Sequence, residues 1–440
     1  MIRETVQRFL AASARRAIRR EKPTIVAITG SVGKSTAKKA IAAALGACEP
    51  GSDVRASHKN YNNEYGVPFT VLAVNAPGRD PFAWVRVLWR AFWVGWGFGR
   101  IKGKTLVLEM GADRKGDLAW LTSIAPPDIS VVTAVAPAHA EYIGTLEDIA
   151  TEKATLVRVL PKDGLAVLNA DDPRVTAMRK ETKANAVYVG ESEGSDVRIR
   201  DVRITTDTDT RGHAMPRGLE VALEDGAHMV RFELVGTIGH PQAWAAGAAL
   251  AVARAFHIAP ELAVERLTRD YHGIAGRTRI IPGIKYTSLI DDTYNAASPT
   301  AVTSGLHDVA SIAVDKGSQR RIAALGDMRE LGAYSDDAHR TVGREVAEGG
   351  FDLLVTCGTL ARAIATSARE AGMPEGSVLS FDSTEEGGRA LQTLIRPGDI
   401  IYVKGSQGSR MEKVVKELMA EPLQAPFLLV RMTEEWARTS

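Results

Sequence analysis

The chain of 440 residues has only two cysteines, Cys48 and Cys357, and they lie far apart in the sequence. So few cysteines exclude a disulfide-stabilised scaffold and fit the reducing environment of the cytoplasm. Either thiol could be reactive, but a small buried hydrophobic side chain is the expected role of both. We therefore expect a cytoplasmic location.

The chain also lacks an excess of charge of either sign, since its formal net charge at pH 7 is +2. This balance gives no reason to expect nucleic acid as a partner. Apolar residues make up 45% and charged residues 25% of the chain, as in ordinary soluble globular proteins. A chain of 440 residues is too long for one hydrophobic core, so two or three domains are expected.

Long uninterrupted apolar runs are missing as well. Arginines interrupt the apolar residues of segment 1–22, so this segment is no secretory signal but a basic helix expected to dock on the next domain. Residues 81–102 hold four of the seven tryptophans, and Arg86 and Arg90 leave too short a run to span a bilayer. There a buried or partner-facing helix is expected. Peripheral contact with a membrane through residues 1–20 or 81–102 is the alternative.

What the chain does have is an alternation of short apolar runs with helical patterns, which predicts a parallel sheet of the α/β class. The predicted strands of this first sheet are residues 23–30, 105–110, 129–135 and 165–170. Residues 187–236 alternate apolar and polar side chains instead, which predicts antiparallel strands with one exposed face. A second α/β sheet is predicted from four runs that end in Gly or Asp, at residues 286–292, 321–327, 352–358 and 399–405.

The strongest local motif is TGSVGKST, directly after the first predicted strand. Backbone N–H groups of a glycine-rich turn and of the following helix N-terminus bind phosphate oxygens, so the motif predicts a nucleotide site. Lys34 would reach the terminal phosphates and Ser35 would bind Mg²⁺. The common form of the motif has glycine where Ile28 stands, so this is a shorter variant. The predicted nucleotide-binding residues are Gly30, Ser31, Gly33, Lys34, Ser35 and Thr36.

Three further residues lie where they could join such a site. Glu109 and His139 are each at or just after the end of a predicted strand, and ligands of open α/β sheets collect there. A carboxylate at that place suits Mg²⁺, although a surface charge is the plain alternative. Lys153 lies on a predicted helix among acidic neighbours, where a solvated lysine is the plain alternative.

A second group of polar residues lies where the second sheet begins. Asp291, Asp292 and Asn295 occupy a strand-to-turn junction, and Arg277 precedes them and could reach a phosphate. Asp and Asn also favour turns for local reasons, so spacing alone leaves both interpretations open.

Taken together, these segments resemble the Mur ligase family of ATP-dependent, amide-forming enzymes. The resemblance is strongest to the branch that joins D-alanyl-D-alanine to a UDP-N-acetylmuramoyl-tripeptide in peptidoglycan precursor synthesis. The similar segments run in family order from about residue 23 to 418: TGSVGKST, KNYNNEYGVPFTVL, LVLEMGADRKGDLAWLT, VAPAHAEYIGTLEDIATEKATLV, VLNADDPRV, GRTR, LIDDTYNAASP, LGDMRELGAYSDDAH and VKGSQGSRMEKVV.

The resemblance implies an α/β fold in which a P-loop central domain, with a parallel sheet and a β-rich appendage, is followed by a Rossmann-like α/β C-terminal domain. The implied domains are an N-terminal basic helix at 1–22, an ATP-binding central domain at 23–276 and a C-terminal domain at 277–440. Family members of this branch also have a separate N-terminal domain that binds the UDP-sugar. Here a single basic helix precedes the phosphate loop, so the binding of a UDP-linked substrate is open.

The resemblance also implies roles for individual residues. Lys34, Lys153, His139 and Arg277 would be catalytic, and Ser35, Glu109 and His139 would bind Mg²⁺. Lys153 matches the lysine that the family carbamylates with CO₂. Asp292 and Asn295 would contact ATP, and Asn62 and Asn63 would lie on the substrate side. Pro241 and Trp244 replace asparagines near the adenine, so His240 or Gln242 is expected to contact the base instead.

The implied reaction begins with attack of a substrate carboxylate on the γ-phosphate, and an amine then attacks the acyl phosphate. It would serve cell-wall biogenesis, cell shape and cell division. Two alternatives remain open at this point. One is a ligase of the same fold with another carboxylate acceptor, such as a different peptide, a polyglutamate-type chain or a lipid-linked precursor. The other is a non-catalytic ATP-binding partner that scaffolds a complex.

Overall fold

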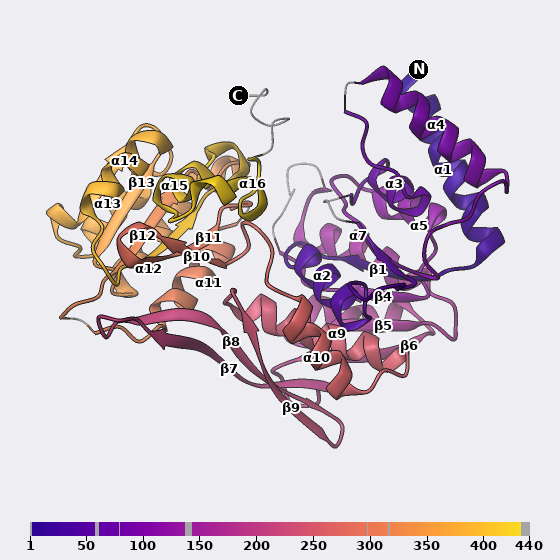
Figure 1. The fold of residues 1–440 in the computed structure, drawn as a ribbon, viewed down its shortest axis with the longest axis horizontal. Helices are drawn as coiled ribbons and strands as arrows, with labels where there is room; N and C mark the ends of the chain where they lie inside the picture. The colour runs from indigo at the N-terminus through magenta and orange to yellow at the C-terminus, as the bar shows by residue number, and fades with distance from the viewer. Residues whose placement is uncertain are drawn as a thin grey trace. The chain divides into compact units, whose positions relative to one another are not determined.

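The computed structural model describes residues 2–57, 61–78, 80–136, 143–296, 298–315 and 317–432. The chain divides into two compact units (Figure 1). Unit 1 comprises Met1–Asp201, Ala222–Phe232 and Ala243–Tyr271, and unit 2 comprises Val202–Val221, Glu233–Gln242 and His272–Ser440. The domain boundaries expected at residues 22/23 and 276/277 stay predictions.

The first sheet has nine strands in the order β2-β3-β1-β4-β5-β6-β7-β8-β9, and all neighbours from β2 to β7 are parallel. Its strands are β1 (Thr24–Thr29), β2 (Val54–Ala56), β3 (Thr105–Glu109), β4 (Ile129–Val132), β5 (Leu165–Asn169), β6 (Asn185–Gly190), β7 (Val197–Thr208), β8 (Ala214–Asp225) and β9 (His228–Val235). The four strands expected for this sheet are confirmed. Because β1, β3 and β4 are parallel neighbours, their carboxyl ends meet at one edge.

The expectation of antiparallel strands within residues 187–236 is wrong for the pair of β6 and β7. The strand β6 pairs in parallel with both β5 and β7 and so extends the parallel sheet. The physical reason is that an alternation of apolar and polar residues reports one exposed face of a sheet. It carries no information on the direction of a strand.

Nine of the described helices accompany this sheet: α1 (Ile2–Glu21), α2 (Lys34–Ala44), α3 (Gly66–Leu72), α4 (Pro81–Gly95), α5 (Asp117–Ile124), α7 (Leu146–Arg158), α8 (Pro173–Ala177), α9 (His240–Ala255) and α10 (Pro260–Asp270). The helices α1, α3, α4 and α5 gather on one side of the sheet (Figure 1) and share one hydrophobic core with β1 and β3. In α1 the buried stripe contains Leu10, Ala14 and Ala17. The expectation that the N-terminal helix docks on the domain is therefore confirmed.

The second sheet has six strands in the order β10-β11-β15-β12-β13-β14, in which only the β10–β11 pair is antiparallel. Its strands are β10 (Arg279–Gly283), β11 (Thr287–Asp292), β12 (Arg321–Gly326), β13 (Leu353–Cys357), β14 (Val378–Phe381) and β15 (Ile400–Lys404). Four of these six were expected. The sequence hides the two edge strands because β10 contains Pro282 and β14 has only four residues, with a half-exposed pattern.

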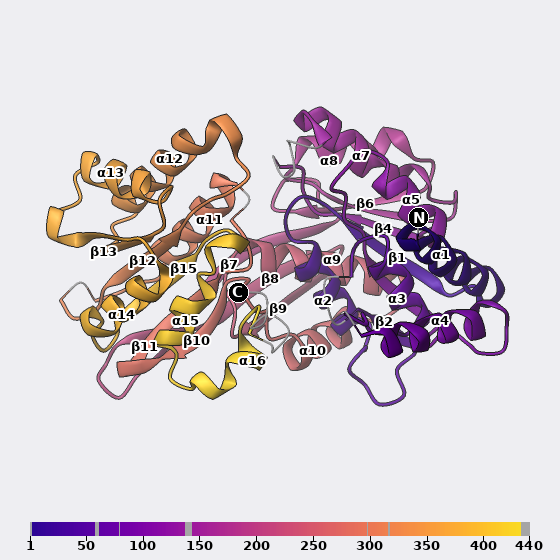
Figure 2. The same cartoon turned by 90° about the horizontal axis from the view of Figure 1, so that it is seen from above.

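Helices cover both faces of this sheet, with α11, α12 and α13 on one side and α14 and α15 on the other (Figure 2). The helices of this part of unit 2 are α11 (Pro299–Ala310), α12 (Ser335–Glu348), α13 (Arg362–Glu370), α14 (Thr384–Leu394), α15 (Glu412–Leu418) and α16 (Ala425–Leu428). Among the helices that the structure describes, none is both long and apolar enough to cross a membrane. Cys357 is buried as expected, but Cys48 is exposed, because it lies in the turn after α2.

Candidate active site

The phosphate loop connects β1 to α2 through two glycines with positive φ angles. At Gly30 φ is +147°, and a Cβ atom there would lie 1.9 Å from Thr133 Oγ1, so only glycine fits between β1 and the end of β4. Gly33, with φ of +84°, lies at the N-terminus of α2, which begins at Lys34. The backbone N–H of Ser31 donates to Ala134 O at 2.8 Å and holds the loop against the neighbouring strand. The predicted turn is therefore present, and it opens onto a helix N-terminus.

Glu109, at the end of β3, is the carboxylate next to this loop. It is 2% exposed. Its Oε2 accepts a hydrogen bond from Ser35 Oγ at 2.9 Å and lies 3.4 Å from Lys38 Nζ. Burial alone would raise the pKa of this carboxyl group, but the ammonium groups of Lys38 and Lys34 and the hydrogen bonds from Ser35 and Asn62 together hold the pKa below its usual value. Glu109 is therefore ionised, and it places a negative charge beside the predicted phosphate site.

Lys34 curls back over the loop that precedes it. Its Nζ donates to Gly30 O at 2.6 Å, which keeps the ammonium group above the turn. Lys38 lies one helical turn further along α2, and its Nζ also donates to Ser57 Oγ at 3.0 Å. Two lysines of α2 thus direct their charges toward the phosphate loop and Glu109.

Lys153 lies on α7 and is 4% exposed. Burial, helped by the positive charge of Lys34, lowers the pKa of Lys153 from 10.5 to about 7, against the opposing effect of Glu152 and Asp113. The solvated lysine that spacing alone allowed is therefore wrong. Its neighbour Glu152 accepts hydrogen bonds from the N–H groups of Gly116 and Leu118, both at 2.9 Å, and ties α7 to the start of α5.

Asn62 and Asn63 lie just before α3 and have different surroundings. Asn62 Nδ2 donates to Glu109 Oε1 at 3.3 Å, so this side chain belongs to the carboxylate cluster. Asn63 Oδ1 accepts from Gly66 N at 2.9 Å and caps the start of α3. A pocket beside them is lined by Asn62, Asn63, Glu64, Gly111, Asp113, Asp117, Trp120 and Leu121.

His139 is a predicted metal ligand that lies outside the described residues, so the structure leaves its position open. Within the described ranges no group of three or more His, Cys, Asp or Glu side chains could by itself hold a metal ion. Any cation at Glu109 would therefore need further ligands from Ser35, from the nucleotide, from water or from residues outside these ranges.

Unit 2 has its own carboxylate cluster at the end of β11. Asp292 Oδ2 lies 2.5 Å from Lys404 Nζ, at the end of the neighbouring strand β15, and accepts from Tyr402 Oη at 3.0 Å. All three side chains are buried. Asp291 accepts from Gly276 N at 2.8 Å, and burial raises the pKa of Asp291 to about 6. Both aspartates therefore bind groups of their own unit.

The other residues predicted in unit 2 surround the turn after β11. The guanidinium of Arg277 lies over the Tyr294 ring, 4.1 Å from its centroid. Asn295 Oδ1 accepts from Ala296 N at 2.8 Å. The structure thus brings Arg277, Asp292 and Asn295 to one turn of unit 2.

The residues expected near the adenine differ in exposure and in the hydrogen bonds that their side chains already make within the protein. Gln242 Nε2 donates to Arg277 O at 3.1 Å, and Trp244 Nε1 donates to Val189 O at 3.0 Å. His240 pairs with Asp308 at 3.1 Å, but its side chain is 60% exposed. Of the two expected base contacts, His240 is the one with an exposed ring.

Sequence reasoning missed Lys38, Lys404 and Arg431. Lys38 follows Lys34 by four residues, so helical spacing could have revealed it. Lys404 ends the strand that pairs with β11, a signal that needs the strand order. Arg431 binds Glu412 and, through Nη2, Thr293 O at 2.6 Å, which fixes the turn after β11 from far along the chain. No local pattern predicts that contact.

Two family models match the chain. The Mur ligase middle domain matches residues 98–250, and the model described as "Mur ligase, glutamate ligase domain" matches residues 276–407. The UDP-N-acetylmuramoyl-tripeptide–D-alanyl-D-alanine ligase of Mycobacterium tuberculosis is 33% identical over 413 residues, which are 90% of this chain and 73% of the relative. The ligase of that name from Bacillus subtilis is 28% identical over 400 residues, which are 91% of this chain and 76% of the relative.

A solved structure is similar over nearly the same range. The MurF ligase of Thermotoga maritima, in complex with ADP, superposes with a TM-score of 0.73 at 25% sequence identity and covers 93% of this chain and 83% of that chain. The likeness confirms the expected α/β architecture, with a P-loop central part followed by a second α/β sheet.

Proposed function

The chain belongs to the Mur ligase family, and we propose that it is an ATP-dependent ligase that forms an amide bond through an acyl phosphate. The observation that carries the proposal is the buried amine of Lys153, in the same unit as the phosphate loop and Glu109. Burying a lysine costs free energy because its charged form loses hydration. Unlike buried Lys404, which is paired with Asp292, Lys153 has a pKa of about 7, so its amine is partly unprotonated and able to react.

We assign the phosphate loop to ATP. Backbone N–H groups from Gly30, Gly33 and Thr36 would bind phosphate oxygens at the N-terminus of α2, while the N–H of Ser31 holds the loop through Ala134 O. Lys34 would carry its positive charge to the β- and γ-phosphates. This assignment is supported by the ADP in the similar structure from Thermotoga maritima.

Ser35 and Glu109 fit a magnesium ion. Their oxygens lie 2.9 Å apart at the meeting point of a helix N-terminus and a strand end, and Mg²⁺ prefers such hard oxygen ligands. We propose that these two side chains and His139 would hold the ion, which when bound neutralises phosphate charge and aligns the groups that react. The assignment of His139 rests on the sequence motif alone.

Lys153 is proposed as the site of a carbamate. Carbamylation needs an unprotonated amine, and a pKa of about 7 supplies that form at neutral pH. The amine nitrogen would attack CO₂, forming an N–C bond and losing a proton, so that a cation becomes an anion. We expect labelled bicarbonate to give a protein-bound carbamate signal by NMR in the wild type and none in Lys153→Met.

The proposed reaction has two steps. A carboxylate oxygen of the acceptor forms a bond to the γ-phosphorus while the bond to the β-phosphate oxygen breaks, which yields an acyl phosphate and ADP. The amine of the second substrate then attacks the acyl carbon, phosphate leaves and the amine loses a proton. In the first step two anions must approach each other, and the charge of Lys34 reduces their repulsion.

We propose that three residues of unit 2 contribute to nucleotide binding: Arg277, Asp292 and Asn295. Arg277 has its guanidinium stacked on Tyr294, which fixes the group in one orientation. Asp292 is held by Lys404 and Tyr402, so its part would be to keep the turn in shape and to offer its remaining lone pairs.

For the substrates we propose a UDP-N-acetylmuramoyl-tripeptide as acceptor and D-alanyl-D-alanine as the amine. The names of the similar proteins from Mycobacterium tuberculosis and Bacillus subtilis support this choice. The acceptor side of the site would include Asn62 and Asn63. Of these, Asn62 donates a hydrogen bond to Glu109.

The test is ADP release from ATP and Mg²⁺, with mass spectrometry of the product. We expect release to require both the muramoyl tripeptide and D-alanyl-D-alanine, and the product to gain the mass of the dipeptide. Release with a different peptide, a polyglutamate-type chain or a lipid-linked acid, and none with a muramoyl peptide, would contradict the proposed acceptor. No ADP release with any acid and amine would contradict the ligase and favour a scaffold.

A further inference from the structure

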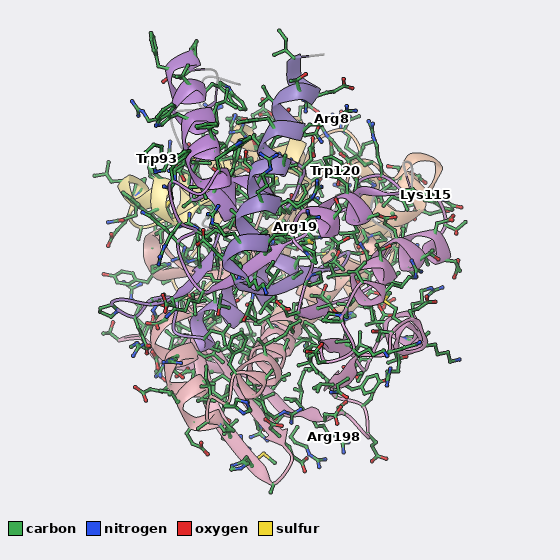
Figure 3. All side chains as sticks on the ribbon, turned by 90° about the vertical axis from the view of Figure 1, so that its right-hand side faces the viewer. Arg8, Arg19, Trp93, Lys115, Trp120 and Arg198 are labelled. Carbon is green, nitrogen blue, oxygen red and sulfur yellow. The ribbon has the colours of Figure 1, made fainter. Side chains whose placement is uncertain are left out.

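The helix α4 is apolar on two opposite faces. Val87, Ala91 and Val94 are buried, and α4 packs closely on α1, where a Cβ atom at Gly95 would come within 2.8 Å of Ser13 Cα. Figure 3 shows the two helices side by side, with Trp93 labelled on α4 and Arg8 and Arg19 on α1. Packing against α1 therefore accounts for the apolar side chains on the buried face of α4.

The opposite face is exposed to solvent. Its side chains recur at the three- and four-residue spacing of one helical stripe and continue into the loop after the helix. Their exposed fractions are 82% at Phe82, 65% at Val85, 62% at Trp89, 37% at Phe92, 40% at Trp93, 43% at Trp96 and 61% at Phe98. We call these seven residues the aromatic stripe. A contiguous exposed apolar surface of this kind marks a site of contact with a membrane or with another molecule.

The stripe is ordered by contacts among its own rings. Trp89 stacks on Trp93 with ring centroids 5.9 Å apart, and Phe92 stacks on Trp96 at 4.9 Å. Phe98, beyond the helix, lies 5.1 Å from Trp93. The rings from Trp89 to Phe98 therefore form one continuous plate over the second half of α4 and the loop that follows it.

Arginines predominate beside this plate, while Asp80 caps the start of α4 and Glu21 accepts a hydrogen bond from Ile101 N. Residues 81–102 contain no acidic residue but have Arg86, Arg90, Arg100 and Lys102. From α1, the guanidinium of Arg16 lies over the Trp96 ring at 4.3 Å, and Arg19 is exposed near the same end of that helix. Arginines beside tryptophans are typical of helices that lie in a membrane interface, where the rings enter the acyl boundary and the cations meet lipid phosphates.

We propose that the aromatic stripe and the arginines beside it form a docking surface for an anionic lipid bilayer, with α4 lying in the plane of the interface. Charge complementarity selects this occupant, because an apolar plate beside which arginines predominate matches a bilayer that is apolar inside and anionic at its headgroups. Tryptophan also suits that boundary, since its ring is apolar and its N–H is polar. The ligase reaction would then proceed beside the membrane. The docking itself depends on neither ATP nor the acceptor.

The test is co-sedimentation of the full chain with vesicles of phosphatidylcholine alone or in an equimolar mixture with phosphatidylglycerol. We expect the anionic vesicles to bind the protein and shift its tryptophan emission to the blue. Affinity should fall by at least about tenfold in the aromatic variant Trp89→Ser/Trp93→Ser/Phe98→Ser. It should fall by about fivefold for each arginine replaced in Arg16→Gln/Arg19→Gln/Arg86→Gln.

A matched control replaces three exposed apolar side chains elsewhere in the chain, Tyr334→Ser/Leu423→Ser/Phe427→Ser, and should bind vesicles like the wild type. ADP release measured on the same preparations reports folding and keeps this proposal separate from the ligase proposal. The proposal is overturned if anionic vesicles do not bind the protein, or if the aromatic variant binds them as well as the wild type does. Self-association that the aromatic variant abolishes, without lipid binding, would likewise overturn it and assign the stripe to a second copy.

Discussion

Unit 1 and unit 2 each have a buried carboxylate beside a buried lysine at the end of a parallel strand, yet the two clusters differ in charge. Two ammonium groups, those of Lys34 and Lys38, act on Glu109. In the part of the chain that the structure describes, Asp292 has one lysine partner, Lys404, together with the hydroxyl of Tyr402. The group around Glu109 is thus positive, whereas the Asp292–Lys404 pair of unit 2 is balanced.

This difference in charge indicates different roles for the two buried lysine–carboxylate groups: ligand binding in unit 1 and stabilisation of the fold in unit 2. A positive cluster at a helix N-terminus favours a polyanion such as a nucleoside triphosphate, and a carboxylate within it can bind the cation that accompanies the phosphates. A balanced buried pair holds two strands and the turn that follows them. The comparison predicts that substitutions in unit 1 change activity, whereas substitutions in the Asp292 pair mainly change stability.

The largest effect is expected from Lys34→Ala. Removal of a charge that acts on the transferred phosphate should slow ADP release on the order of a thousandfold, with little change in thermal unfolding. The control is Lys39→Ala on the same helix, since Lys39 is exposed and lies over the Tyr271 ring. Equal losses in both variants would break the assignment of the loop to ATP phosphates.

The next largest effect is expected from Asp292→Asn, which leaves the ammonium group of Lys404 buried without its carboxylate. Such a loss costs about 4 kcal/mol of unfolding free energy, measurable by urea denaturation. The double variant Asp292→Asn/Lys404→Met should recover most of it. In contrast, Asp382→Asn, which breaks an exposed pair with Arg362, should cost less than about 1 kcal/mol. A cost at Asp292 as small as that at Asp382 would contradict the balanced pair.

A smaller effect, with a defined pH dependence, is expected from Lys153→Met. The pKa of Lys153 is about 7 in the folded protein and 10.5 in an unfolded chain, so between these values the unfolded state binds more protons. The wild type therefore gains stability as the pH rises from 7 to 10.5. Below pH 7 the variant should be more stable by a few kcal/mol, and the difference should vanish near pH 10.5.

Denaturation of both proteins in buffer free of CO₂ measures this difference, with Lys39→Met as the exposed control. A difference that stays constant across the pH range would contradict a buried, titrating amine at Lys153.

The sequence predicts the phosphate loop well because every step of that prediction is local. A β-branched run, two glycines and GKS lie within twelve residues, and the structure has β1, the turn and α2 in that order. The ends of β3 and β11 were predictable for the same reason, since Glu109 and Asp292 terminate apolar runs.

What could not be predicted depends on contacts between distant segments. The pairing of Asp292 with Lys404 needs β11 and β15 to be neighbours, although more than a hundred residues separate them. The burial of Lys153 depends on packing around α7, which the polar neighbours in the sequence conceal. The exposed rings of α4 were also hidden, because an apolar run does not reveal which of its faces is covered.

The central claim, that the cluster of unit 1 binds phosphate through cations and a metal through Glu109, is tested by calorimetric titration of ATP with and without Mg²⁺. The wild type should bind ATP about tenfold more tightly with Mg²⁺ than without it. Glu109→Gln should lose this enhancement and keep its affinity for metal-free ATP, and Asp292→Asn should keep the enhancement. Equal loss of both affinities in Glu109→Gln, or loss of the enhancement in Asp292→Asn, would contradict the account.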